Sequence, residues 1–220
     1  MTDIGGNVRR ILERIQGAAK RAGRSPDSVR LLAVTKTVSP DHIREAIACG
    51  VTDIAENRLQ EALPKRQALA SEILSWHFIG RLQTNKAKKV VENFDCVHSV
   101  DRVELAEALA RQVSQSPLPV LIEVKLWEEQ NKSGLSEAAL PALVSSVRAL
   151  QNLQLRGLMA IPPPVDDPEQ ARPFFRRLRL LAEDLGLSEL SMGMTHDFEV
   201  AIEEGATMVR IGTGLFGSRW

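Results

Sequence analysis

A lysine and an arginine lie within or directly after short apolar segments, where charged side chains are rare. Lys36 follows the run 31–34 (LLAV), and Arg210 lies between Val209 and Ile211. A lysine that is partly buried among apolar groups loses hydration, which favours its neutral amine. The neutral amine is the form that attacks a carbonyl to give a Schiff base. Lys36 is therefore a candidate nucleophile toward an aldehyde or ketone.

The segment 210–217 (RIGTGLFG) places a glycine-rich G-x-G-x-x-G pattern after an apolar run. It is not a dinucleotide-binding motif, because only three residues follow it and a βαβ unit needs many more. Glycines at such a turn still let backbone N–H groups approach a phosphate closely. We expect the Ser191 hydroxyl and the amides near Gly193, Thr213 and Gly214 to share one phosphate. A tight turn without a ligand is the alternative for these glycines.

A phosphate site opposite a desolvated lysine points to a phosphorylated carbonyl compound. Pyridoxal 5′-phosphate (PLP) fits, with its aldehyde at Lys36 and its phosphate near Ser191 and Thr213, and a phosphosugar on a Schiff-base aldolase fits the same features. Between lysine and phosphate, the cation of Arg210 would bond the pyridine nitrogen. That contact disfavours protonation of the nitrogen and weakens the ring as an electron sink.

Eight runs of strand length alternate with segments of helical periodicity, which is typical of a parallel (β/α)8 barrel, a TIM barrel in the α/β class. One barrel would use residues 1–220 as a single domain, and an open doubly wound sheet is the alternative. The expected strands are Leu31–Val34, Thr52–Ala55, Trp76–Ile79, Cys96–Ser99, Val120–Val124, Leu155–Met159, Leu190–Gly193 and Thr207–Ile211.

Alternation along these strands predicts which charges point into the barrel. Val209 and Ile211 take the helix-facing parity and turn Arg210 inward, and the fifth strand places Glu123 and Lys125 inside in the same way. A structural ion-pair network is as good an interpretation of Glu123 and Lys125 as a functional one. By contrast, Lys36 should rise from the C-terminal end of its strand, where barrel enzymes keep their chemistry.

Helix boundaries are marked by capping residues. A first helix is expected over Asn7–Ala22, followed by Gly23 as a stop. The later starts are indicated by Ser39 with Pro40, by Asp101 with Glu104 and by Ser136, and the later ends by Gly50, Gly186 and Gly205.

Composition excludes several classes of protein. Lys plus Arg and Asp plus Glu both number 28, so no net charge attracts nucleic acid or anionic lipid. The isolated Cys49 and Cys96 indicate free thiols in a reducing compartment, and the absence of a long apolar stretch predicts a cytoplasmic protein. The four histidines show no ligand spacing, so no metal is expected.

Several stretches together resemble a known family over essentially the whole chain, from the first helix to Gly217. They are AVTK at 33–36, ENRLQE at 56–61, WHFIGRLQTNK at 76–86, KSGL at 132–135, LM at 158–159, LSMGM at 190–194 and VRIG at 209–212. The chain resembles the PLP homeostasis proteins, small single-domain relatives of the alanine racemase barrel.

The resemblance implies a PLP fold-type III barrel without a second β domain, and PLP as an internal aldimine on Lys36. It implies that Arg210 approaches the ring nitrogen and that Ser191, Gly212, Thr213 and Gly214 hold the phosphate. Asn57, His77 and Met192 match positions near the cofactor, although Asn57 and His77 could equally be satisfied polar groups of the barrel. The chain departs from the usual family pattern at 194–196 (MTH) but keeps the acid at Asp197.

The implied role is maintenance of the PLP pool and of amino-acid and keto-acid balance, without an established reaction. Apo-PLP enzymes are candidate transient partners, and the sequence does not decide between direct contact and release into solution. The sequence supports this role independently, because a racemase needs a second base and its relatives use a tyrosine, whereas this chain contains no tyrosine. The alternative is a slow PLP-dependent racemase or lyase, in which His77 or His98 replaces that base. Without the racemase's additional domain, a monomer is expected.

Overall fold

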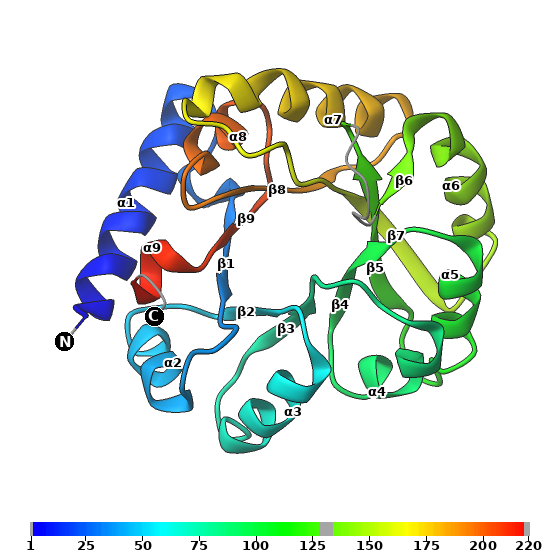
Figure 1. Cartoon of the computed structure of the whole chain (residues 1–220), viewed down its shortest axis with the longest axis horizontal. Helices are drawn as coiled ribbons and strands as arrows, with labels where there is room; N and C mark the ends of the chain where they lie inside the picture. Colours follow the sequence, from blue (N-terminus) through cyan, green and yellow to red (C-terminus); the bar gives the residue numbers. More distant parts are fainter. Residues whose placement is uncertain (1, 128–133, 218–220) are drawn as a thin grey trace.

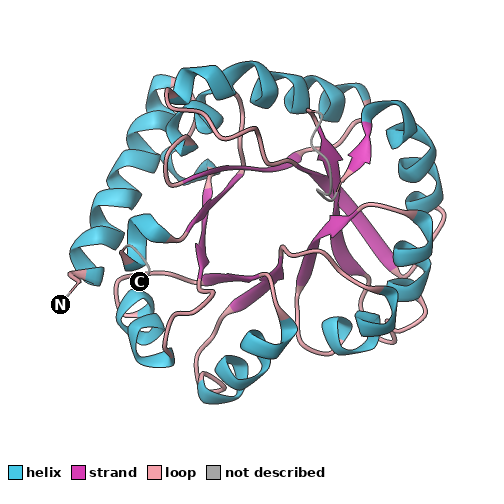
Figure 2. Cartoon of the chain, in the orientation of Figure 1, coloured by secondary structure: helices cyan, strands magenta, loops and turns pink. Residues whose placement is uncertain are grey.

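The chain folds into a closed barrel of parallel strands enclosed by helices (Figures 1 and 2). The structure is a computed structural model that describes residues 2–127 and 134–217. Strand β1 (Arg30–Val34) pairs in parallel with β2 (Asp53–Glu56) on one side and with β9 (Met208–Ile211) on the other. Leu32 lies opposite both Asp53 and Arg210, so the first and last strands close the barrel. Closure excludes the open doubly wound sheet.

All eight expected strands are present, and their ends differ from the expected ones by at most two residues. The remaining barrel strands are β3 (Ser75–Phe78), β4 (Cys96–Val100), β5 (Leu118–Lys125), β7 (Leu153–Met159) and β8 (Glu189–Met194). A two-residue strand that the sequence did not indicate, β6 (Leu135–Ser136), pairs with the end of β5 outside the barrel order.

Helices cover the outside of the barrel (Figure 2). They are α1 (Ile4–Arg21), α2 (Pro40–Ile47), α3 (Leu59–Ala68), α4 (Ala87–Val91), α5 (Val103–Ala110), α6 (Leu140–Arg148), α7 (Arg172–Asp184), α8 (Phe198–Glu203) and α9 (Thr213–Phe216), with 3-10 turns η1 (Pro26–Ser28), η2 (Thr84–Lys86), η3 (Glu137–Ala139) and η4 (Pro168–Ala171). No helix among them is long and apolar enough to cross a membrane.

Of the four predicted helix starts, one is confirmed and three are wrong. The first helix begins at Ile4 instead of Asn7, because the Asp3 side chain caps it by accepting the Gly6 N–H. The Ser39 hydroxyl accepts a hydrogen bond from the His42 N–H at the start of α2. In contrast, α5 begins after Arg102 rather than Asp101 and has no side-chain cap. Ser136 precedes a 3-10 turn without capping it. At both sites the strand before the helix runs almost directly into it, so packing rather than a cap fixes the start.

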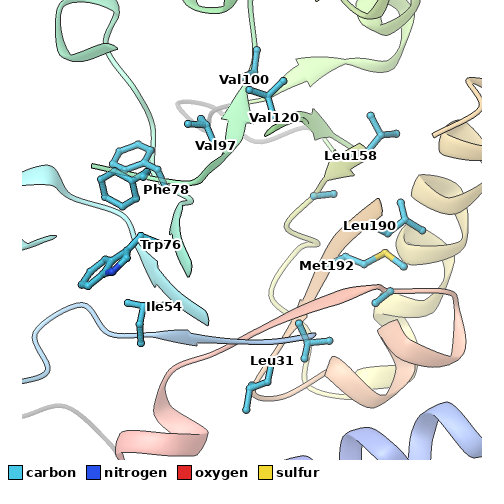
Figure 3. Close-up of a cluster of buried hydrophobic side chains, with 14 of the residues drawn as sticks. Leu31, Ile54, Trp76, Phe78, Val97, Val100, Val120, Leu158, Leu190 and Met192 are labelled. Carbon is cyan, nitrogen blue, oxygen red and sulfur yellow. The ribbon is translucent and has the colours of Figure 1, made fainter. Parts of the chain in front are cut away.

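The main hydrophobic core lies between the strands and the helices (Figure 3). It takes one parity of each strand, for example Ile54, Trp76 and Phe78. The other parity points into the barrel and forms a small apolar cluster of Leu32, Val34, Ala55, Cys96, Leu121 and Met208. Because this inner cluster is small, the rest of the barrel interior is left for polar side chains.

Helix α1 lies beside the adjacent strands β1 and β9 and contacts helices α8 and α9 (Figure 1). Its Arg14 and Arg21 make ion pairs with Glu199 and Glu203 of α8 at 3.1 and 3.0 Å. The Asn7 side-chain amide donates to the carbonyl oxygen of Leu215 in α9 at 2.9 Å. The glycine-rich segment after β9 is thus tied to the first helix.

Candidate functional site

A cavity of about 480 Å³ opens at the C-terminal ends of the barrel strands. This is the end at which barrel proteins place their chemistry. Its walls come from loops after β1, β2, β3, β7, β8 and β9 and from the interior of β5. They consist of Val34, Lys36, Asn57, Ile79, Gly80, Arg81, Glu123, Ile161, Met194, Thr195, His196, Arg210, Gly212 and Thr213.

Lys36 lies on a tight turn just after β1, and the residues beside it are firmly held. The buried Thr35 donates its hydroxyl to Glu56 Oε1 at 2.6 Å. The Lys65 ammonium donates to the Thr35 carbonyl at 2.6 Å and to the same Glu56 oxygen at 2.7 Å. Thr37 has a positive φ of 62° and donates its N–H to Glu61 at 2.9 Å. The half-buried Lys36 is therefore presented to the cavity by a rigid turn.

The loop after β8 brings Thr195 and His196 to the cavity wall. It turns at Gly193, whose φ is +89° and whose added Cβ would lie 2.6 Å from the Cβ of Ala201. Asp197 closes the turn, because its Oδ1 accepts the Met194 N–H at 2.7 Å. Burial raises the pKa of Asp197, with the Met194 N–H and Arg210 acting in the opposite direction. The acid thus shapes the loop.

The glycine-rich segment meets that loop from the other side. Thr213 donates its hydroxyl to Thr195 Oγ1 at 3.2 Å, and the Gly214 N–H donates to the same oxygen at 3.2 Å. A Cβ on Gly214 would lie 3.0 Å from the Thr195 methyl, so a larger residue would push the two segments apart. The two loops together form a small polar corner of hydroxyl groups and backbone amides.

Arg210 lies at the floor of the cavity with its side chain pointing into the barrel, as the strand alternation predicted. Its Nη1 donates to the Ser191 carbonyl at 2.6 Å and to Ser191 Oγ at 2.9 Å, and its Nη2 donates to the Ala160 carbonyl at 3.0 Å. Burial lowers the pKa of Arg210 to about 10, partly offset by Asp197 and Glu123. At neutral pH the guanidinium is a fixed positive charge.

Below Arg210, polar side chains fill the centre of the barrel. His98 Nδ1 lies 2.9 Å from Ser191 Oγ, His98 Nε2 lies 2.9 Å from His77 Nδ1, and His77 Nε2 lies 3.0 Å from Asp53 Oδ1. Ser191, His77 and His98 are all at most 3% exposed. Ser191 and His77 therefore lie beneath the cavity and are not part of its wall.

Asn57 lies at the cavity wall, and its Oδ1 is buried without a hydrogen-bond partner among the described residues. The backbone there is tightly packed, because a Cβ on Gly80 would lie 2.1 Å from the Asn57 carbonyl oxygen. A buried acceptor without a donor is costly. Asn57 therefore has unused capacity to accept a hydrogen bond from a ligand.

His77, Cys96 and His98 bring their ligand atoms to within 4.8 Å of one another. Spacing in the sequence gave no indication of this cluster, because the three residues come from neighbouring strands. Each nitrogen of the two rings already has a protein partner. Burial raises the pKa of the Cys96 thiol to about 12, which opposes the thiolate that a metal would need.

The structure brings together Lys36, Asn57, Arg210, Gly212 and Thr213, all expected from the sequence, and places Gly214 directly behind Thr195. Met192 instead packs outward into the main core (Figure 3). The alternation that turns Ser191 inward could have indicated this, because Met192 is the next residue.

Thr195 and Glu123 also line the cavity. Thr195 was not among the expected site residues, although its position beside Asp197 in the expected phosphate region could have suggested it. Glu123 faces the cavity as expected, whereas Lys125 is half-buried and does not line it. Lys132 and Ser133 of the KSGL stretch lie outside the described residues.

Comparison with known proteins gives consistent matches over the whole chain. The profile of the family described as "Alanine racemase, N-terminal domain" matches residues 7–219. A pyridoxal phosphate homeostasis protein from Pseudomonas aeruginosa is 49% identical over 100% of this chain and 97% of its own. A solved structure from Bifidobacterium adolescentis, described as an unknown protein, has a TM-score of 0.91 at 38% identity, covering 98% of this chain and 97% of its own.

A second solved structure, PipY of Synechococcus elongatus with PLP bound, has a TM-score of 0.83 at 40% identity. The match covers 94% of this chain and 100% of PipY.

Proposed function

Because this chain belongs to the family of pyridoxal phosphate homeostasis proteins, we propose that it holds PLP reversibly in the cavity above Arg210 and maintains the PLP pool. The observation that carries the proposal is the convergence of Lys36, Arg210 and the Thr195/Thr213 corner on one cavity of about 480 Å³. That volume lies within the usual range for sites of small ligands. The wider role that we propose is a contribution to amino-acid and keto-acid balance.

The cavity walls fit the chemical groups of PLP. Lys36 would supply an amine of the kind that forms a Schiff base with an aldehyde. The hydroxyls of Thr195 and Thr213 and the backbone around Gly212 and Gly214 suit the phosphate, and the unpartnered Oδ1 of Asn57 is an acceptor for a hydroxyl group. Bound PLP would supply an electron-withdrawing ring to any amine attached to it.

Within this proposal Ser191 supports the site from below. Its hydroxyl lies between Arg210 Nη1 and His98 Nδ1, each at 2.9 Å. A hydroxyl that already serves two partners in a fully buried position is poorly placed to bind a phosphate. We therefore assign the phosphate to Thr195 and Thr213.

We further propose that turnover is not the main role of the protein. Arg210 offers only N–H donors, so a ring nitrogen bound against it would be held unprotonated and the ring would be a weaker electron sink. The chain contains no tyrosine to act as a second base on the opposite face of the ring. His77 and His98 are buried beneath the cavity, where they hydrogen-bond to each other, and they do not line the cavity.

The proposal is tested by the visible spectrum of the purified protein after addition of PLP. We expect an absorption band of lysine-bound PLP in the wild type that is absent from Lys36→Ala. Lys125→Ala is the matched control, because Lys125 is half-buried at the end of β5 but does not line the cavity. The proposal fails if the wild type gives no band or if Lys36→Ala keeps it.

Catalysis is tested separately with L-amino acids in deuterated water. Exchange at Cα at a physiologically useful rate, abolished by Lys36→Ala, would show a racemase or lyase and displace the holding role. Reversible holding further predicts transfer of PLP to an apo-PLP enzyme. Transfer faster than spontaneous release would support direct transient contact between the two proteins, and equal rates would contradict such contact.

A further inference from the structure

Five polar side chains form a continuous hydrogen-bonded row through the centre of the barrel. The row begins at Arg210 under the cavity and passes through Ser191, His98 and His77 to Asp53 on β2. Its four links measure 2.9, 2.9, 2.9 and 3.0 Å. Asp53 also accepts the Thr52 hydroxyl at 2.7 Å. Every member of the row is at most 8% exposed, so water does not compete for these bonds.

With both rings neutral, the two ends of the row fix the direction of every hydrogen bond in it. Arginine can only donate and an ionised aspartate can only accept. Arg210 therefore donates to Ser191 Oγ, and His77 Nε2–H donates to Asp53. The ring of His77 then accepts at Nδ1 from His98 Nε2–H, and His98 accepts at Nδ1 from the Ser191 hydroxyl. With neutral rings, the reverse order would point the His77 Nε2 lone pair at the carboxylate.

The charges of the surrounding groups agree with this direction. Burial works to raise the pKa of Asp53, but hydrogen bonds from His77 and Thr52 outweigh it and hold the pKa below its usual value. Burial lowers the pKa of His98 well below its usual value, and His77 and Arg210 act in the same direction. The row therefore has a cation at one end, an anion at the other and a neutral His98 between them.

We propose that Asp53, His77, His98 and Ser191 are positioning residues that hold Arg210 in one orientation at the cavity floor. The Ser191 and Ala160 acceptors take three of the five N–H groups of Arg210, which leaves two without a partner in residues 2–127 and 134–217. Arg210 lines the cavity together with Glu123, and Asp197 and Glu123 are the charged groups that act on it. The link to PLP rests on the proposed function, whereas the direction of the row does not.

The first test is nitrogen NMR of the two histidine rings in cofactor-free protein. We expect the Nε2–H tautomer in both rings near neutral pH. An Nδ1–H tautomer in either ring, or an imidazolium, would overturn the proposed row. This result is independent of PLP, so failure of the proposed function and failure of the row are distinguishable.

A metal titration separates the row from a metal site built on the same residues. In the proposed row each ring nitrogen is occupied by a protein partner, so addition of Zn²⁺ should leave both ring spectra unchanged. Stoichiometric binding of Zn²⁺ that shifts the nitrogen resonances of both His77 and His98 would make the cluster with Cys96 a metal site and overturn the proposal.

The second test breaks the row and reads the effect at the cavity. Ser191→Ala removes the side-chain acceptor of Arg210 and the donor to His98, and it keeps the two backbone carbonyls that Arg210 also bonds. Cys96→Ala removes a buried side chain from the same interior without touching the row. In PLP-loaded protein we expect Ser191→Ala to move the pH midpoint of the visible band by about one unit, a tenfold change in proton affinity. Cys96→Ala should leave the midpoint in place.

Equal midpoints in the two variants would overturn the positioning role. If Ser191→Ala does not fold, Asp53→Asn provides the same comparison from the other end of the row. It keeps the shape of the side chain and removes its charge, so we expect a smaller shift in the same direction as the Ser191→Ala shift. A midpoint equal to that of Cys96→Ala would again contradict the role.

Discussion

Lys36 and Arg210 reach the same cavity by different physical routes. Lys36 lies beyond the end of its strand, on a turn that keeps it half-buried at the mouth. Arg210 lies within its strand and is 4% exposed, so its charge is compensated by the Ser191 and Ala160 carbonyls rather than by water. The amine is therefore the accessible group, and the guanidinium is the fixed one.

The threonines of the polar corner should contribute measurably to PLP affinity. Thr195→Val removes the oxygen that meets Thr213 and the Gly214 amide. Hydrogen bonds to a charged group contribute about 1.5–3 kcal/mol each, so we expect PLP to bind about 10- to 100-fold more weakly. Equilibrium dialysis measures this, with the exposed Thr84→Val as control. An unchanged affinity would contradict the assignment of the phosphate to this corner.

The turn after β1 depends on a buried ion pair from two neighbouring elements. Glu56 ends β2 and Lys65 lies in α3, and both contact Thr35 beside Lys36. Glu56 is fully buried and the Lys65 side chain is 10% exposed. The pair thus connects strand β2 and helix α3 to the turn that carries Lys36.

Loss of the Lys65 charge should destabilise the fold strongly. Lys65→Met leaves Glu56 as an uncompensated buried charge, which typically costs about 3–5 kcal/mol. We expect this loss in the free energy of unfolding, measured by urea denaturation. Lys65→Arg keeps the charge and should lose much less. Equal losses in the two variants would show that the shape of the lysine matters and its charge does not.

The turn after β8 should tolerate no side chain at Gly193. Its φ of +89° and the approach of Ala201 both oppose a Cβ. Positive φ alone costs a non-glycine residue about 1–2 kcal/mol. Gly23→Ala is the matched control, because Gly23 has φ +67° and nothing within 4 Å of its added Cβ. Urea denaturation should show a larger loss for Gly193→Ala, and equal losses would mean that the contact with α8 relaxes.

At the scale of the whole molecule, barrel closure buries polar side chains, and burial changes the pKa of His98 between the unfolded and the folded chain. His98 at the centre is fully buried, and its pKa lies well below that of an exposed histidine. Below about pH 6.5, His98 is therefore protonated in the unfolded chain but stays neutral in the folded chain. Stability is fully present above this pH and is lost as the pH falls.

The free energy of unfolding should accordingly fall by about 1 kcal/mol between pH 7 and pH 5.5 through His98 alone. Asp53, whose pKa is lowered, acts in the same direction only at more acidic pH. Urea denaturation at several pH values measures the slope. The slope should be reduced in His98→Phe and retained in Cys96→Ala, and an equal slope in both would contradict the assignment to His98.

The monomer expected from the sequence stays a prediction at this scale. Sedimentation equilibrium of the purified chain measures it directly. A dimer that persists on dilution would contradict the expectation.

Residue types and alternation determined much of this protein without any coordinates. Strand-length runs separated by helical segments indicated the barrel, because each local pattern depends only on neighbouring residues. The parity of β9 predicted an inward Arg210, and that of β5 an inward Glu123. Lys36 was identifiable because a lysine that directly follows a buried apolar strand extends toward the open C-terminal end of the barrel.

Tertiary structure alone decided which polar groups meet. Asp53, His77, His98 and Ser191 come from four strands, and the offset between strands, which no single segment encodes, brings them into contact. The same holds for Thr195 against Thr213, which depends on two loops packing side by side. The sequence by itself thus determined which face each side chain takes, and only closure of the barrel determined its partner, because contact distances depend on the register of the whole sheet.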